Sequence, residues 1–167
     1  MTLFETHNGA LFSECRAYRY ALWRLWDAAD LGCVLFVGLN PSTADETEDD
    51  PTIRRCIRFA RDWGYGGIYV CNLFAFRATE PKRMKAASDP IGPINDGLIF
   101  RYSRYCAMKI AAWGNAGMFM NRDLAVQRPW ILSKPLHCLG TNKNGTPKHP
   151  LYLPATSKPQ LYGVSNV

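Results

Sequence analysis

The sequence lacks the features that identify several large classes of protein. Its six cysteines form no C-x-x-C pair, so the common zinc-binding and thiol-redox motifs are absent. Several cysteines lie inside apolar runs, as small hydrophobic residues do, which favours a reduced protein over a disulfide scaffold. No apolar run approaches the roughly 20 residues of a membrane-spanning helix, and residues 1–7 do not resemble a signal peptide. We therefore expect a cytoplasmic protein with no membrane partner, metal or cofactor.

The length and composition predict a single globular domain. A chain of 167 residues can bury a sizeable core but is short for two domains. Hydrophobic residues make up 47% and charged residues 20%, as in ordinary globular proteins. The net charge of +6 is compatible with a phosphate-bearing partner, although many basic proteins bind no nucleic acid. We expect the core to cover about residues 18–154, with a C-terminal tail over 155–167.

An apolar run that leads into a polar loop is the most informative stretch. Residues 34–37 are apolar, and Gly38 leads into a loop that contains Asn40 and Pro41. Such a run predicts a strand buried on both faces. Ligands of open α/β sheets bind beyond the carboxyl ends of these strands, where Asn40 would offer a donor and an acceptor. Pro41 disfavours the α-helical backbone conformation at Asn40. However, Asn-Pro is also common in ordinary turns.

The segment that follows carries strong helix signals. Asp50 at the N-cap, Pro51 at the first helical position and Gly64 at the end predict a helix between them. Three arginines recur at helical spacing on one face: Arg54, Arg58 and Arg61. This stripe is either a solvated charged face or a surface that contacts the phosphates of a nucleic acid.

Strands and helices alternate along the rest of the chain. The expected strands cover 67–72, 107–113 and 136–140, and the expected helices cover 94–105 and 117–127. Aromatic residues in 11–15 and 18–26 predict a hairpin, with a helix over 18–26 as the competing assignment. Alternating elements imply βαβ crossovers. We therefore predict an α/β three-layer sandwich with a mostly parallel, four-stranded central sheet and an N-terminal β-hairpin.

This topology brings four strand ends to one edge of the sheet. They carry the following residues: Asn40, Asn72, Trp113-Gly114 and His149. Because the carboxyl ends of parallel strands share an edge, we expect a ligand site there. The alternatives are an Asx-turn at Asn72 and a surface turn at His149.

Six short stretches resemble a bacterial and phage family known as domain of unknown function 1643. They are Asn40–Asp45, Asp50–Arg55, Trp63–Gly66, Asn72–Ala75, Ala112–Gly114 and His149–Tyr152. The resemblance covers about residues 18–154. The name of that family carries no activity.

Four motifs are also similar to motifs of the uracil-DNA glycosylase superfamily. Gly38–Pro41 resembles the Gly-x-Asn-Pro motif of its mismatch-specific and single-strand-selective branches. Asn72 resembles the asparagine that reads the base edge, and Trp113-Gly114 and His149-Pro150 resemble two later motifs. The resemblance implies a glycosylase-like fold and a hydrolase acting on the N-glycosidic bond of an unusual or modified base. The chain departs from the pattern after Pro150, where the intercalating residue is missing.

The resemblance and the residue types together suggest roles at this site. Asn40 would orient a water molecule but cannot act as a general base, so slow chemistry is expected. His149 would donate a hydrogen bond to the departing base. Asn72 would read the base edge, and Phe74 would stack on the base unless it belongs to the core. Asp45 is the nearest candidate for a carboxylate base.

The remaining expectations concern substrate contacts and partners. Further substrate-binding residues are expected at Gly38, Leu39, Pro41, Ser42, Trp113, Gly114 and Pro150, and nucleic-acid backbone contacts at Arg54, Arg58 and Arg61. The acidic run over 45–50 complements a helix dipole better than it fits a magnesium site. The partner would be DNA or a free nucleotide. The alternatives are a non-catalytic nucleic-acid or nucleotide-binding module and a base-modifying enzyme with the same pocket.

Overall fold

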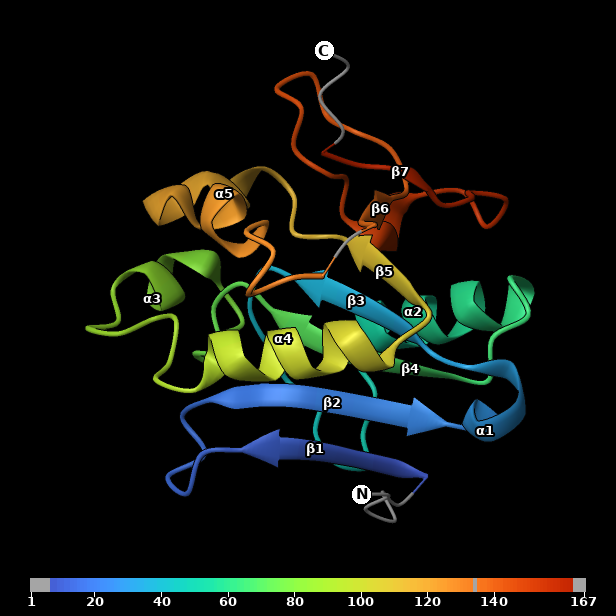
Figure 1. The fold of residues 1–167 in the computed structure, drawn as a ribbon. Coiled ribbons are helices and arrows are strands. Elements are labelled where there is room, and N and C mark those ends of the chain that lie inside the picture. Colours follow the sequence, from blue (N-terminus) through green and yellow to red (C-terminus); the bar gives the residue numbers. More distant parts are fainter. Residues whose placement is uncertain (1–6, 134, 164–167) are drawn as a thin grey trace.

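A computed structural model describes residues 7–133 and 135–163. Residues 1–6, considered above for a signal peptide, and the last four residues of the expected tail lie outside this range. The described chain is α/β and contains a seven-stranded sheet of order β1-β2-β4-β3-β5-β6-β7 (Figure 1). Its strands are β1 (Asn8–Phe12), β2 (Arg19–Leu25), β3 (Val34–Gly38), β4 (Gly67–Asn72), β5 (Met108–Ala111), β6 (His137–Cys138) and β7 (Gln160–Leu161).

The centre of the sheet is parallel and its margins are antiparallel. β3 lies between β4 and β5, and β5 pairs with β6, all in parallel. The hairpin of β1 and β2 joins this centre through the antiparallel pair β2–β4. Because β2 is a strand, the competing helix over 18–26 is excluded. The sheet is larger than the four strands expected, since the hairpin extends one edge and residues 160–161 of the expected tail form β7 at the other.

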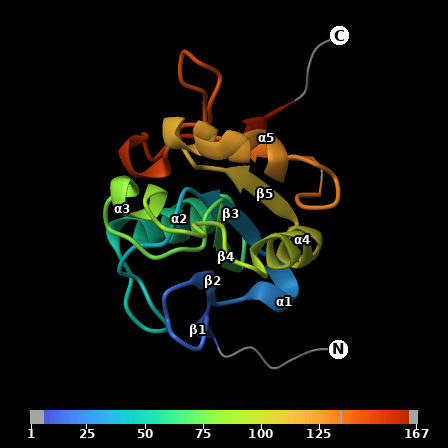
Figure 2. The same cartoon turned by 90° about the vertical axis from the view of Figure 1, so that its left-hand side faces the viewer.

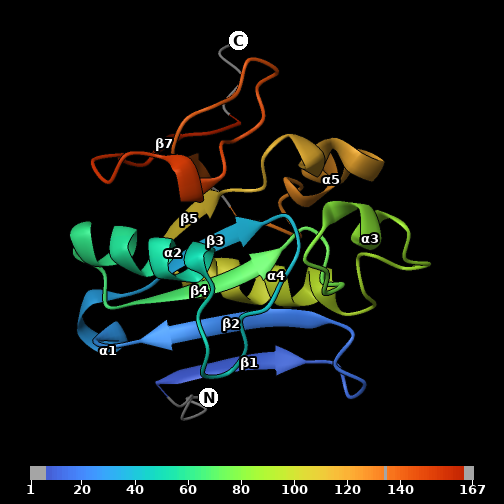
Figure 3. The same cartoon turned by 180° about the vertical axis from the view of Figure 1, so that it is seen from behind.

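Helices lie on both faces of the sheet. The longest are α2 (Pro51–Asp62) and α4 (Asn95–Tyr105), which lie on opposite faces (Figures 1 and 3). The shorter ones are α1 (Ala28–Leu31), α3 (Pro81–Lys85), α5 (Arg122–Val126) and the 3-10 turns η1 (Asn115–Asn121) and η2 (Pro150–Tyr152). The helix expected over 117–127 is interrupted, because Met120 and Asn121 have positive φ angles. None of these helices is long and apolar enough to cross a membrane.

The signals read from the sequence of α2 are confirmed. Asp50 is the N-cap, and its side chain accepts a hydrogen bond from the Ile53 N–H at 2.8 Å. Pro51 begins the helix, where its missing N–H costs nothing. Beyond the helix, Gly64 has a φ of +85°, a conformation that glycine adopts without strain.

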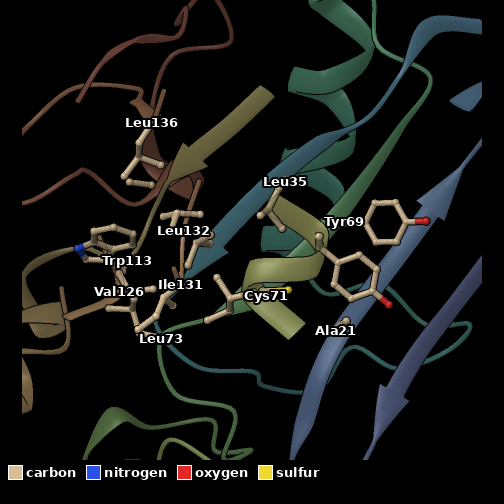
Figure 4. Packing of buried hydrophobic residues seen from close by; sticks show 14 of the residues in the cluster. Ala21, Leu35, Tyr69, Cys71, Leu73, Trp113, Val126, Ile131, Leu132 and Leu136 are labelled. Atoms are coloured by element: carbon tan, nitrogen blue, oxygen red, sulfur yellow. The ribbon is translucent and has the colours of Figure 1, made fainter. Parts of the chain in front are cut away.

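Each face of the sheet has its own hydrophobic cluster. On the α2 face, Ile53, Cys56 and Phe59 pack against β3 and β4. On the α4 face, Tyr69 stacks on Tyr102 with ring centroids 4.7 Å apart. Figure 4 shows part of this second cluster, in which residues of β3 and β4 lie near the side chains of Trp113, Val126, Ile131, Leu132 and Leu136. None of the six cysteines forms a disulfide and five are buried, consistent with their interpretation as small hydrophobic residues.

Candidate functional site

A pocket of about 370 Å³ lies at the carboxyl ends of β3 and β4, on the α2 face of the sheet. Residues of the β3–α2 loop, the first turn of α2 and the turn η2 form its walls. Figure 2 views the molecule from the side toward which β3 and β4 point, which is the left-hand side of Figure 1. The volume lies within the range of about 300–1,000 Å³ typical of small-molecule sites. Among its lining residues are eight that the sequence predicted at the site: Gly38, Leu39, Asn40, Ser42, Asn72, Trp113, His149 and Pro150.

The side-chain amide of Asn40 is held in one orientation. Its Nδ2 donates to the carbonyl oxygen of Ala78 at 2.8 Å and to that of Pro41 at 3.1 Å. Two carbonyl acceptors require the nitrogen on that side, so the network assigns the positions of both amide atoms. Both amide hydrogens are therefore used, and Oδ1 is left as an acceptor in the pocket wall.

Asn72 presents a polar group that the protein does not satisfy. The residue is only 4% exposed, and its Nδ2 is buried without a hydrogen-bond partner. Gly38 pairs with Asn72 across the sheet, and a Cβ atom at Gly38 would lie 2.8 Å from Asn72 Oδ1. A side chain at position 38 would therefore push this amide out of its present position. An unpaired buried amide costs free energy, about 1–3 kcal/mol, which a ligand acceptor would recover.

The backbone that carries Asn72 is clamped from the opposite face of the sheet. Asn95 Nδ2 donates to the carbonyl oxygens of Asn72 and Leu73 at 2.9 and 3.1 Å. Arg122 Nε donates to the Leu73 carbonyl at 2.8 Å and also pairs with Asp96. These contacts hold the carboxyl end of β4 in place.

The hydrogen bonding of His149 determines its tautomer. The Leu151 N–H donates to His149 Nδ1 at 3.2 Å, so Nδ1 must accept. Burial lowers the pKa of His149 below its ordinary value, an effect larger than the opposing influence of Asp50. The ring is therefore neutral near pH 7 and carries its proton on Nε2. His149 is thus a neutral hydrogen-bond donor at the pocket wall.

Two charged residues in the pocket were missed by the sequence reasoning. Arg19 of β2 is 2% exposed, and burial lowers its pKa to about 10, so it remains charged at neutral pH. Asp50 also lines the pocket, and its negative charge acts to raise the pKa of both Arg19 and His149, against the larger effect of burial. The sequence predicts Asp50 as a helix cap within the acidic run over 45–50. Nothing in the local sequence of Arg19 distinguishes it from the other arginines.

Several residues predicted at the site lie elsewhere. Phe74 is fully buried on the α4 face, where it packs against Phe119, so it cannot stack on a ligand in this pocket. The Asp45 carboxylate accepts from the N–H groups of Glu48 and Thr47, which lowers its pKa, and it does not line the pocket. Pro41 and Gly114 do not line the pocket either. Asp45 therefore lies outside the pocket in which a carboxylate base was expected, and the carboxylate that lines this pocket is that of Asp50.

Trp113 lines the pocket but packs mainly below it. Its ring lies in the cluster on the α4 face (Figure 4). Tyr162 is in edge contact with this ring. The indole Nε1 is buried without a hydrogen-bond partner. A side chain at Gly117 would collide with this ring, because a Cβ atom there would lie 2.2 Å from Cδ1.

The three arginines of α2 lie outside the pocket. Arg58 is exposed and lies 3.9 Å from Asp62, while Arg61 stacks over the ring of Trp26. Arg54 donates to the carbonyl oxygen of Asp49 at 2.7 Å. These contacts suffice to explain a solvated charged face.

No cluster of three or more His, Cys, Asp or Glu side chains that could hold a metal ion occurs among the described residues. Asp50 is the single carboxylate among the described residues that line the pocket. The side-chain donors and acceptors of the lining residues include amide, imidazole, guanidinium, hydroxyl and carboxylate groups.

Comparisons with known proteins identify a family but no activity. Neither the curated proteins nor the solved structures include a match to this sequence or fold. The profile of one family, described as a protein of unknown function (DUF1643), matches residues 19–151. That range includes β2, the whole of the pocket wall and most of the sheet. The chain therefore belongs to the DUF1643 family.

Proposed function

We propose that the pocket binds a nucleobase or nucleotide and that the protein hydrolyses its N-glycosidic bond, as the uracil-DNA glycosylase superfamily does. One observation carries the proposal. The fixed acceptor of Asn40, the neutral donor of His149 and the unpaired amide of Asn72 belong to residues of the same pocket. A base presents donors and acceptors along a flat edge, which such a set would read.

The chemistry follows from what each group can do. A water molecule held by Asn40 Oδ1 would attack the anomeric carbon as the bond from that carbon to the base nitrogen breaks. The electron pair of the broken bond goes to the base, and His149 Nε2–H would stabilise the resulting anion by a hydrogen bond. Asn40 cannot take the proton that the water loses, so this proton would pass to Asp50 or to solvent. The charge of Asp50 would also stabilise the developing sugar cation.

The test is base release from a panel of modified oligonucleotides and nucleotides. Asn40→Ala and His149→Ala should abolish release while circular dichroism shows an intact fold. Asp50→Ser is the matched variant for the carboxylate, because serine retains an N-cap acceptor but removes the charge. It should slow release without loss of α2. Base release that is unchanged in all three variants would refute the mechanism.

A second candidate is a binding module without catalysis. It is favoured by the engagement of Asp50, whose Oδ1 accepts from Ile53 N and whose role in the helix cap needs no chemistry. This alternative predicts binding of a base or nucleotide that depends on Asn72 and His149, with no base release from any substrate. Chemistry on the base that leaves the glycosidic bond intact would instead indicate a base-modifying enzyme.

A further inference from the structure

Arg19 is a buried cation with most of its hydrogen-bonding capacity unused. A guanidinium has five N–H donors. In Arg19, Nη1 donates to the carbonyl oxygen of Ala44 at 2.9 Å, and Nε is buried without a partner. No carboxylate lies within ion-pair distance of Arg19 in the described part of the chain, although the charge of Asp50 is felt there. Natural proteins rarely leave a buried guanidinium in this condition.

An irregularity in the hairpin accounts for the position of this arginine. The pairing of β1 with β2 shifts by one residue, so that Leu11 faces Ala21 but Phe12 faces Arg19. Such a bulge changes the face on which the following side chain lies. Ala21 packs on the α4 face, whereas Arg19 lines the pocket on the α2 face. The bulge therefore directs a positive charge into the site.

The first turn of α2 lies in the same pocket. Pro51, Thr52 and Ile53 all line it. Pro51 has no N–H, and Ile53 N is capped by Asp50, which leaves the Thr52 N–H as an uncommitted donor. The N-terminus of a twelve-residue helix attracts anions. The two positive features are thus a charged side chain and a helix end, opposed by the single carboxylate of Asp50.

We propose that Arg19 and the first turn of α2 form a subsite for the terminal phosphate of a free mononucleotide. This inference rests on the proposed function, because Asn72 and His149 would hold the base of the same ligand. A terminal phosphate can reach a buried arginine. An internal phosphodiester is linked to chain on both sides and needs an open groove instead. The preferred substrate is therefore a nucleoside monophosphate rather than a DNA strand.

Calorimetry with matched ligands tests this subsite. The probes are the nucleosides of the common and deaminated bases, their 5′- and 3′-monophosphates, inorganic phosphate and a single-stranded oligonucleotide without terminal phosphate. We expect a monophosphate to bind at least tenfold more tightly than its nucleoside, and the unphosphorylated oligonucleotide to bind no better than the nucleoside. Arg19→Met and Arg19→Gln should remove the advantage of the monophosphate, and Arg19→Lys should retain part of it.

The control is Arg58→Met, which removes a positive charge of the same type from the exposed face of α2. It should leave the ratio of monophosphate to nucleoside affinity unchanged. Two results would contradict the phosphate subsite but not the base pocket. One is equal affinity for nucleoside and monophosphate, and the other is tighter binding of the monophosphate that persists in Arg19→Met. Arg19-dependent binding of inorganic phosphate, with no binding of any nucleoside or monophosphate, would support the anion subsite but reject the proposed base pocket. If no probe binds, both are rejected.

Discussion

Each end of β2 carries a buried arginine, and the two arginines differ in how many hydrogen bonds their side chains make. Near one end, Arg24 Nε donates to Asp49 Oδ1 at 2.8 Å, and its other nitrogens donate to four backbone carbonyls. At the other end, the guanidinium of Arg19 has a single hydrogen bond among the described residues, to the carbonyl of Ala44. The two side chains are almost equally buried, at 3% and 2% exposed. Burial therefore does not distinguish them, whereas hydrogen bonding does.

The difference indicates which arginine supports the fold and which belongs to the pocket. Arg24 ties the β3–α2 loop to the hairpin, because its acceptors include the carbonyls of Asp45 and Glu48. Its donors are satisfied, so it has little left to offer a ligand. The guanidinium of Arg19 has one hydrogen bond among the described residues, and its buried Nε has none. The same residue type on one strand thus has a structural position and a candidate binding position.

The largest expected effect comes from the satisfied arginine. Arg24→Met removes one partner of a buried ion pair and leaves Asp49 and several carbonyls without their donor. We expect a loss of about 3–5 kcal/mol in the free energy of unfolding. Urea denaturation would measure it. A loss below about 1 kcal/mol would contradict the structural role assigned to Arg24.

The amide of Asn40 should contribute to the stability of the protein, because both of its N–H groups donate to backbone carbonyls. Asn40→Asp would place a carboxylate oxygen opposite the carbonyls of Ala78 and Pro41, where Nδ2 now donates. We expect a loss of about 1–3 kcal/mol at neutral pH, largest when the new carboxyl is ionised. Thermal unfolding at several pH values would measure it. If this variant is as stable as the parent, the amide orientation described above is wrong.

The stability of the pocket region should fall in mild acid because of His149. Its folded-state pKa lies below the ordinary value of 6.5, mainly through burial. Between those two values the unfolded chain binds a proton that the folded chain does not. Stability should therefore be complete above about pH 6.5 and decrease as the pH falls below it. His149→Asn can keep the acceptor for Leu151 N and cannot titrate, so its stability should depend less on pH.

Burial also lowers the pKa of His137, so His137 contributes to the pH dependence of stability as well. Its contribution is common to the parent and to His149→Asn, so it cancels in the difference between their pH profiles. Identical profiles of unfolding free energy from pH 8 to pH 5 would show that His149 does not gain from being neutral.

The smallest expected effect comes from the unsatisfied arginine. Arg19→Met removes one hydrogen bond and leaves the Ala44 carbonyl unpaired, but it also removes a charge that burial disfavours. The two contributions oppose each other, so we expect a change within about 1 kcal/mol. The same urea experiment as for Arg24→Met measures it. A loss as large as that of Arg24→Met would remove the distinction between the two arginines.

Much of the pocket could be predicted because strand ends and caps are local features. The apolar run before Gly38 and the cap formed by Asp50 and Pro51 are readable from a few neighbouring residues. Parallel pairing of β3 and β4 then brings Asn40 and Asn72 to one edge of the sheet, and the turn η2 adds His149 to the same pocket. Phe74 was misplaced because a residue beyond a strand end can turn to either face of the sheet, and its ring lies in the α4-face core.

The amino-acid sequence alone determined the α/β class, the boundaries of α2 and the polar residues at the strand ends, since periodicity and capping act over a few residues. Only the tertiary structure decided the remaining features of the pocket. A one-residue shift in the pairing of β1 with β2 moves Arg19 to the pocket face of the sheet. No local sequence pattern predicts this shift. Likewise, the unpaired amide of Asn72 and the burial that lowers the pKa of His149 depend on packing, because folding decides which groups are buried and which of them find partners.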